Sequence, residues 1–282
     1  MTTPGAQLTR VARVMPRPVR LIAQFTRANV MLTLEYRTGF LIYMFNTVAG
    51  PTISLLVWLT VEANAQGGLP MDRAELVTYF VLMSAVSMLS DTWAGQYIAD
   101  EIKSGALSNY LLRPASPAAH YIGNNMGEKV IKIWLLLPFV AGVALLFRAD
   151  VRLTDDLRRW AALGVALVLA AVLTFELDYL IGSLAFWLQD VSGLATLNSL
   201  LEGLLAGRFV PLAMFPREAA PVLELQPWRY LLSFPLEIVT GTLPVEAIGR
   251  GLVLQAVYAA GLIGAHRLVW RYGLRVYAAV GR

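Results

Sequence analysis

Four charged side chains lie inside long apolar stretches of the sequence. Glu176 and Asp178 are two residues apart in one apolar segment. Glu202 and Arg208 lie in the next one. In hydrocarbon each such charge costs about 2.5–3.5 kcal/mol unless it is paired or hydrated. These groups could therefore line a polar substrate path or a proton relay, or they could form a structural ion pair that fixes the register of two helices.

The two acids of the first segment cannot act on the same face. Residues two apart are separated by about 200° around an α-helix, so Glu176 and Asp178 point in different directions. Little more than Asp190 separates the two apolar segments, which predicts a tight antiparallel hairpin. One acid could then reach Arg208, and the other could face a cavity. The functional and the structural interpretation both stay open at this point.

Motifs for enzyme chemistry are missing from the sequence. It has two histidines and no cysteine, and it contains no HExxH, Gly-x-Ser-x-Gly or dinucleotide-binding pattern. The nearest approach to a phosphate-binding loop, Gly123-Asn-Asn-Met-Gly127-Glu-Lys129, lacks the GxxxxGK[ST] spacing and leads into an apolar segment. We therefore expect a protein that is not an enzyme, with no catalytic residue, metal site or cofactor on this chain.

The composition is typical of a membrane protein. Hydrophobic residues make up 57% of the 282 residues and charged residues only 15%, whereas soluble domains have about 25% charged residues. A helix that crosses the bilayer needs about 20 apolar residues. The sequence predicts an all-α polytopic membrane protein with six transmembrane helices, at about 38–61, 74–97, 126–147, 160–189, 191–215 and 248–270.

Other segments predict elements at the membrane surfaces. Residues 1–37 mix arginines with apolar residues, which predicts a tail and an interfacial amphipathic helix. Residues 217–247 contain several prolines and an apolar piece that is too short to span and is interrupted by Pro235. They predict a re-entrant or interfacial helical hairpin. Lys129 and Lys132 begin the third span, and we expect their side chains to extend toward the interface.

The distribution of basic residues predicts the orientation. Lysine and arginine are more frequent in residues 1–37, in the loop 96–132 and in the basic tail 271–282 than in the loops on the opposite side. The positive-inside rule then places both termini and this loop in the cytoplasm, and the hairpin 217–247 outside. Residues 38–270 form the predicted transmembrane domain.

The stretch 96–117, QYIADEIKSGALSNYLLRPASP, contains most of the helix and turn signals in the middle of the chain. Ile98 and Ile102 are four residues apart and predict a short amphipathic helix. Gly105 predicts a reversal after it, and Pro114 predicts a stop after a second short helix. A sharply bounded, mixed-charge element between two spans suits the docking of a soluble partner. A solvated loop without a partner is the alternative.

The residues of this stretch resemble those of a known family. The pattern Glu101-Ile102-x-Ser104-Gly105-x-Leu107-x-x-Tyr110-Leu111-Leu112-Arg113-Pro114 resembles the loop of type 2 ABC export permeases in which a cytoplasmic coupling helix meets the ATPase subunit. The order of the predicted elements resembles that family over nearly the whole chain. The ending Arg271-Tyr272-Gly273-Leu274-Arg275-x-Tyr277-x-x-x-Gly281 resembles the branch described as uncharacterised or viologen-type export permeases.

This resemblance implies a function and a set of partners. The chain would pair with an identical or related permease among the lipids of the bacterial cytoplasmic (inner) membrane, with no nucleic-acid partner. Cytoplasmic ATPase subunits that hold ATP and Mg²⁺ would drive alternating access, and a hydrophobic or amphipathic substrate would move outward. The residues implied in coupling to the ATPase are Asp100, Glu101, Ser104, Gly105, Leu107, Tyr110, Leu111, Arg113 and Pro114.

Two other functions are compatible with the residues. An ion-coupled secondary transporter would use Glu176, Asp178 and Arg208, and it would follow a proton or sodium gradient without an ATPase partner. A membrane scaffold subunit would transport nothing.

Overall fold

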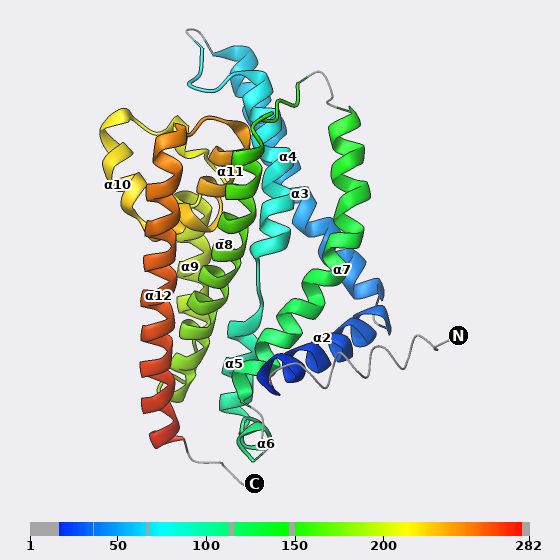
Figure 1. Cartoon of the computed structure of the whole chain (residues 1–282), viewed down its shortest axis with the longest axis vertical. Coiled ribbons are helices and arrows are strands. Elements are labelled where there is room, and N and C mark those ends of the chain that lie inside the picture. Colours follow the sequence, from blue (N-terminus) through cyan, green and yellow to red (C-terminus); the bar gives the residue numbers. More distant parts are fainter. Residues whose placement is uncertain (1–16, 36, 66–67, 113–115, 147–149, 278–282) are drawn as a thin grey trace.

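The computed structural model describes residues 17–35, 37–65, 68–112, 116–146 and 150–277. All regular elements within these ranges are helices, and the long ones run side by side along the long axis of the molecule (Figure 1). In this part of the chain, three helical stretches are long and apolar enough to cross a membrane: Arg73–Lys103, Leu157–Phe186 and Val245–Val276. The described residues therefore form an all-helical membrane protein, as the composition predicts.

The N-terminal helix lies across one end of the bundle. α2 (Arg17–Glu35) crosses the lower part of α7 (Pro117–Leu146) (Figure 1). Two glycines of α7 permit this contact, because a Cβ at Gly123 would lie 2.4 Å from the Cβ of Phe25, and Gly127 is similarly close to α2. A helix is thus present in the predicted N-terminal segment, whose beginning lies outside the described residues.

The second predicted span consists of two helices. α4 (Arg73–Ser90) and α5 (Ala94–Lys103) are separated by the non-helical residues 91–93. α3 (Arg37–Asn64) packs beside α4. The span predicted at 74–97 thus lies within the candidate span Arg73–Lys103, and its helix is broken at residues 91–93. Such a break leaves backbone groups that other elements must satisfy.

The fourth and fifth predicted spans differ in length. α8 (Leu157–Ser183) continues into η1 (Leu184–Phe186), but α9 (Ser192–Leu205) has only 14 residues. At 1.5 Å per residue, α9 is about 21 Å long, which is less than the hydrocarbon core. α9 ends where Gly207 takes a left-handed conformation with φ of +86°. The expectation of a helix as far as residue 215 was wrong for this reason.

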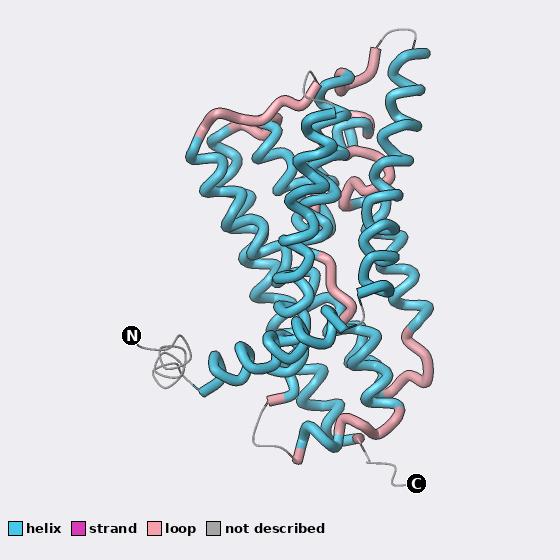
Figure 2. The backbone as a smooth tube through the Cα atoms, turned by 90° about the vertical axis from the view of Figure 1, so that its right-hand side faces the viewer, coloured by secondary structure: helices cyan, strands magenta, loops and turns pink. Residues whose placement is uncertain are grey.

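The segment before the last helix folds into several short helices. They are η2 (Leu212–Met214), η3 (Arg217–Ala219), α10 (Ala220–Leu225), η4 (Pro227–Leu231) and α11 (Ser233–Thr240). Figures 1 and 2 show them at the end of the molecule opposite α2. Tyr230, Leu231 and Phe234 are buried against α8 and α12 (Val245–Val276). Pro235 lies in the first turn of α11, where proline fits a helix, so it does not interrupt the apolar piece.

A capping box begins α4. The Asp72 carboxylate accepts a hydrogen bond from the Glu75 backbone N–H at 2.8 Å, and the Glu75 carboxylate accepts one from the Asp72 N–H at 2.9 Å. The Glu75 N–H is the main reason that the pKa of Asp72 lies below its ordinary value of 3.8. The ionised form of Asp72 therefore stabilises the start of this helix.

We expect the substitution Asp72→Ala to lower the free energy of unfolding by about 1 kcal/mol at neutral pH, because it removes the cap of α4. The folded-state pKa is depressed, so this contribution is complete above pH 3.8 and is lost as the pH falls below that value. Thermal unfolding of the detergent-solubilised protein at pH 7 and pH 3 would measure the loss of stability and its pH dependence. Asp155→Ala, at an exposed position, is the control. An equal effect of both variants at pH 7 would rule out the capping role.

Candidate functional site

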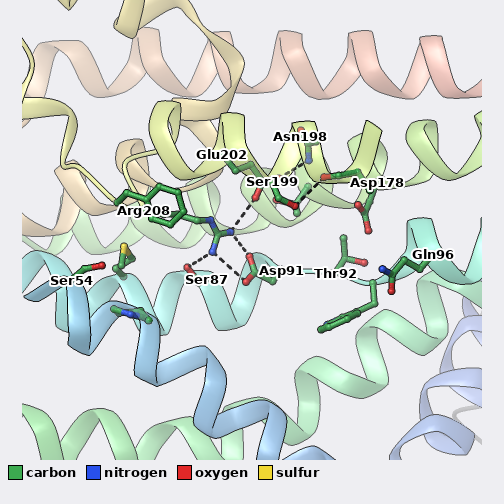
Figure 3. A pocket seen from close by; sticks show the side chains of 17 residues that line it. Ser54, Ser87, Asp91, Thr92, Gln96, Asp178, Asn198, Ser199, Glu202 and Arg208 are labelled. Atoms are coloured by element: carbon green, nitrogen blue, oxygen red, sulfur yellow. Dashed lines mark hydrogen bonds and ion pairs between the residues drawn. The ribbon is translucent and has the colours of Figure 1, made fainter. Parts of the chain in front are cut away.

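A polar cavity of about 480 Å³ lies between α3, α4, α8 and α9 (Figure 3). Its charged lining residues are Asp91, Asp178, Glu202 and Arg208. Its polar lining residues include Ser54, Ser87, Thr92, Gln96, Asn198 and Ser199. Three carboxylates and one guanidinium thus share one space among apolar helices. Their partners decide what this cavity can do.

Arg208 connects two elements that are distant in the sequence. Its guanidinium donates hydrogen bonds to Asp91 Oδ1 at 2.6 Å and to the Ser87 hydroxyl at 3.1 Å, at the end of α4. Its Nη2 also lies 3.4 Å from Glu202 Oε2 on α9. One guanidinium therefore compensates two carboxylates and links α4 to α9 (Figure 3).

The turn after α9 brings Arg208 to this position. The Phe209 N–H donates to the Gly203 carbonyl at 2.9 Å and closes the turn. The Gly207 carbonyl accepts a hydrogen bond from the Tyr79 hydroxyl at 3.0 Å. A Cβ at Gly207 would lie only 2.4 Å from that hydroxyl, so both the backbone conformation and the space require glycine.

Arg208 is paired with Asp91 and Glu202 instead of with Glu176 or Asp178. The reason is the early end of α9. Arg208 lies on a turn that returns toward α4 and not on a helix that faces α8. The sequence signals for this arrangement are Gly207 and Pro211, which follow α9. We interpreted both residues as part of a continuous span.

The two acids of α8 face different surroundings, as their spacing predicts. Asp178 lines the cavity, and its Oδ2 accepts a hydrogen bond from the Gly95 backbone N–H at 3.1 Å. Glu176 is buried away from the cavity and contacts Nδ1 of His266 on α12 through Oε2. Only Asp178 can therefore meet a molecule in the cavity.

The His266 contact was missed by the sequence analysis. Tyr179 stacks on the His266 ring with centroids 4.3 Å apart, and Glu176 lies one turn away on the same helix. These residues join α8 to α12 inside the bundle. A histidine and a carboxylate that both occur in apolar segments were the available signal, but their separation in the sequence concealed the pairing.

Lys129 and Lys132 do not extend to an interface. Lys132 is fully buried and forms an ion pair with Glu128 at 2.6 Å. Lys129 donates to the backbone carbonyls of Ser90 and Asp91 at 3.3 and 2.9 Å. Its ammonium thus satisfies the C-terminal end of α4, where the helix dipole favours a cation. Packing of α7 against α2 and α4 explains why our expectation of snorkelling was wrong.

Residues 94–112 form the predicted helix, reversal and short helix. α5 is followed by Gly105, whose φ of +77° is left-handed, and then by α6 (Ser108–Leu111). Ile98 and Leu107 are fully buried in a cluster with residues of α7 and α8. The local signals in this stretch were therefore sufficient to predict its shape.

The other side of this element faces outward. Its exposed side chains are Gln96, Tyr97, Asp100, Lys103, Ser104, Asn109, Leu111 and Leu112. Leu112 is 87% exposed despite its apolar side chain. Arg113 and Pro114, which we also predicted as coupling residues, lie outside the described residues. An exposed leucine pair at the tip of a short element suits contact with another protein.

Glu101 and Tyr110 are turned into the protein. The Glu101 carboxylate accepts a hydrogen bond from the Tyr121 hydroxyl of α7. The Tyr110 ring stacks on the His120 ring, with centroids 4.5 Å apart. Both Glu101 and Tyr110 are among the residues that the family resemblance implies in coupling to the ATPase. These contacts instead attach the element to α7.

The backbones of α5 and α8 are in direct contact. A Cβ at Gly182 would lie 2.5 Å from the Gly95 carbonyl oxygen, and a Cβ at Gly95 would lie 2.7 Å from the Asp178 carbonyl oxygen. No flexible side chain separates the two helices at this point. The first turn of α5 is therefore the start of the outward-facing element. It also reaches the cavity, because Gln96 lines it and the Gly95 N–H donates to the lining residue Asp178.

A helical membrane protein with a polar cavity between its helices has the features of a membrane transport subunit. The family model described as ABC-2 family transporter protein matches residues 51–281. The chain belongs to this family and is an ABC-2 type permease. Comparisons with curated proteins and with solved structures gave no match. Membership of this family implies pairing with an ABC ATPase subunit.

Proposed function

We propose that this chain is the transmembrane permease subunit of an ATP-driven ABC exporter that moves a hydrophobic or amphipathic substrate outward. A separate ATPase subunit binds ATP and Mg²⁺ in the cytoplasm, and this chain performs no catalysis. Six membrane segments place both termini and the α5–α6 element on the cytoplasmic side of a bacterial inner membrane. A second permease, identical or related, completes the assembly.

The α5–α6 element is the observation that carries this proposal. It lies at the end of the molecule where α2 also lies, far from the short helices α10 and α11 (Figures 1 and 2). Its inner face is buried, and its tip presents Leu111 and Leu112. A rigidly attached element with an exposed apolar tip suits a partner that pushes on it.

The contacts of α5 provide a direct route from this element to the cavity. α5 and α8 touch at Gly95 and Gly182, so a displacement of α5 must move α8 or separate the two helices. The same displacement alters the hydrogen bond from the Gly95 N–H to Asp178, which lines the cavity. A push on the tip would thus change the cavity without any intermediate element.

The alternatives have less support. In ion-coupled transporters, the C-terminal carbonyls of broken helices often hold the coupling cation. Here the Lys129 ammonium occupies the carbonyls at the end of α4, and Arg208 is engaged with Asp91 and Glu202. A scaffold subunit would not need a polar cavity. Membership of the ABC-2 family favours the ATP-driven function.

We expect purification of the tagged chain from its native membrane to recover an ATPase with a phosphate-binding loop, identified by mass spectrometry.

We expect Gly105→Pro to abolish transport driven by that ATPase, because proline cannot take a φ of +77°. Gly68→Pro is the matched control, because Gly68 has nearly the same φ (+79°) in the loop between α3 and α4. Recovery of the chain alone, or normal transport by Gly105→Pro, would contradict the proposal.

A further inference from the structure

A second cavity, of about 410 Å³, lies between α8, η4 and α12. It is separate from the polar cavity. Its lining includes Leu173, Leu177, Trp228, Leu231, Val257 and Gly261. None of these side chains carries a charge, so this cavity is apolar where the first one is charged.

The polar ends of the two amphipathic side chains in this lining point elsewhere. The Tyr258 hydroxyl donates to the Leu225 carbonyl. The Trp228 Nε1–H donates to Asn198 Oδ1 at 3.1 Å. Both residues therefore present the apolar faces of their rings to the cavity. Water needs two to four polar partners in a cavity and would find few here.

The position of this cavity identifies its occupant. Leu173 and Leu177 lie in the second half of α8, and Val257 and Gly261 lie in the central part of α12. Both helices are candidate membrane spans. At this depth the surroundings are the hydrocarbon of the bilayer. Val257, which lines the cavity, is also 59% exposed, so the cavity is continuous with the outer face of α12.

We propose that the cavity between α8, η4 and α12 binds one acyl chain of a membrane phospholipid. A straight aliphatic chain matches the apolar lining, and the bilayer supplies it at this depth without desolvating a polar group. The proposal depends on the chain spanning a membrane and does not depend on ATP-driven export.

The bound chain would also support the polar cavity. Trp228 lies between the two spaces, since its ring borders the apolar cavity and its N–H holds Asn198, which lines the polar one. An acyl chain packed against the indole ring would restrict its rotation. The lipid would thereby keep the Asn198 amide in place.

Fluorescence quenching tests the proposal directly. The full chain is reconstituted into vesicles of phosphatidylcholine that carries bromine near the middle of its acyl chains, and into matched vesicles without bromine. The chain has seven tryptophans, so the difference between wild type and Trp228→Phe isolates the Trp228 emission. We expect bromine to quench this component at least twofold, because the brominated segment would lie against the indole ring.

Filling the cavity should remove that quenching. A Cβ at Gly261 would meet no atom within 4 Å, so the leucine of Gly261→Leu can extend into the cavity and displace an acyl chain. Gly264→Leu is the matched control on the same helix, where a Cβ also meets no atom within 4 Å and the residue does not line the cavity. We expect Gly261→Leu to lose at least half of the Trp228 quenching and Gly264→Leu to retain it. Circular dichroism would verify that all variants keep their helices.

Two results would overturn the proposal. One is Trp228 emission that is equal in brominated and plain vesicles. Chemical cross-linking through α12 would then show whether a second copy of the chain covers the cavity in place of the lipid. The other is quenching in Gly261→Leu that equals that of wild type, because the bromine would then reach Trp228 by a different route.

Discussion

The substitution Arg208→Met is expected to lower the free energy of unfolding by about 2–3 kcal/mol and to abolish transport. It leaves Asp91 and Glu202 in the cavity without the cation that now contacts both. Loss of one partner of a fully buried pair costs about 3–5 kcal/mol, and we expect less because the Arg208 side chain is 24% exposed. Thermal unfolding in detergent and transport by reconstituted vesicles would measure the two effects.

Two further variants separate charge from geometry at this position. Arg208→Lys keeps the positive charge but not the forked donor that reaches Asp91 and Ser87 together, so it should recover only part of the lost stability. Arg217→Met removes an exposed arginine and should leave both measurements unchanged. The explanation fails if Arg208→Met is as stable as Arg217→Met.

The substitution Gly182→Val is expected to disrupt the contact between α5 and α8. Its Cβ would lie 2.5 Å from the Gly95 carbonyl oxygen, and backbone atoms cannot rotate away as a side chain can. Overpacking of this kind costs about 1–3 kcal/mol, and we expect the upper end of that range. Because α5 would no longer follow α8, we also expect hydrolysis by the partner ATPase to continue without transport.

Gly164→Val is the matched control for this prediction. Gly164 is on the same helix, and a Cβ there would meet no atom within 4 Å. The ratio of substrate transported to ATP hydrolysed, measured in vesicles, should fall for Gly182→Val and stay at the wild-type value for Gly164→Val. Equal ratios in the two variants would show that this glycine contact does not transmit motion.

Local signals in the sequence determined the helical class and the shape of the α5–α6 element. The spacing of Ile98 and Ile102 defines a buried helix face, and Gly105 accepts a left-handed conformation that other residues resist. Both effects act within a few residues, so no knowledge of the rest of the fold was needed. The two directions taken by Glu176 and Asp178 follow from helix geometry in the same way.

Only the tertiary structure decided which charged groups meet. The end of α9 before Arg208 turns this side chain toward Asp91, although the two residues are 117 positions apart in the sequence. Glu176 contacts His266, although the two residues are 90 positions apart in the sequence. Lys129 is buried because α4 breaks where α7 crosses it. Ion pairing depends on distances of a few ångströms between separate helices, and these distances are set by packing that hydrophobic periodicity does not encode.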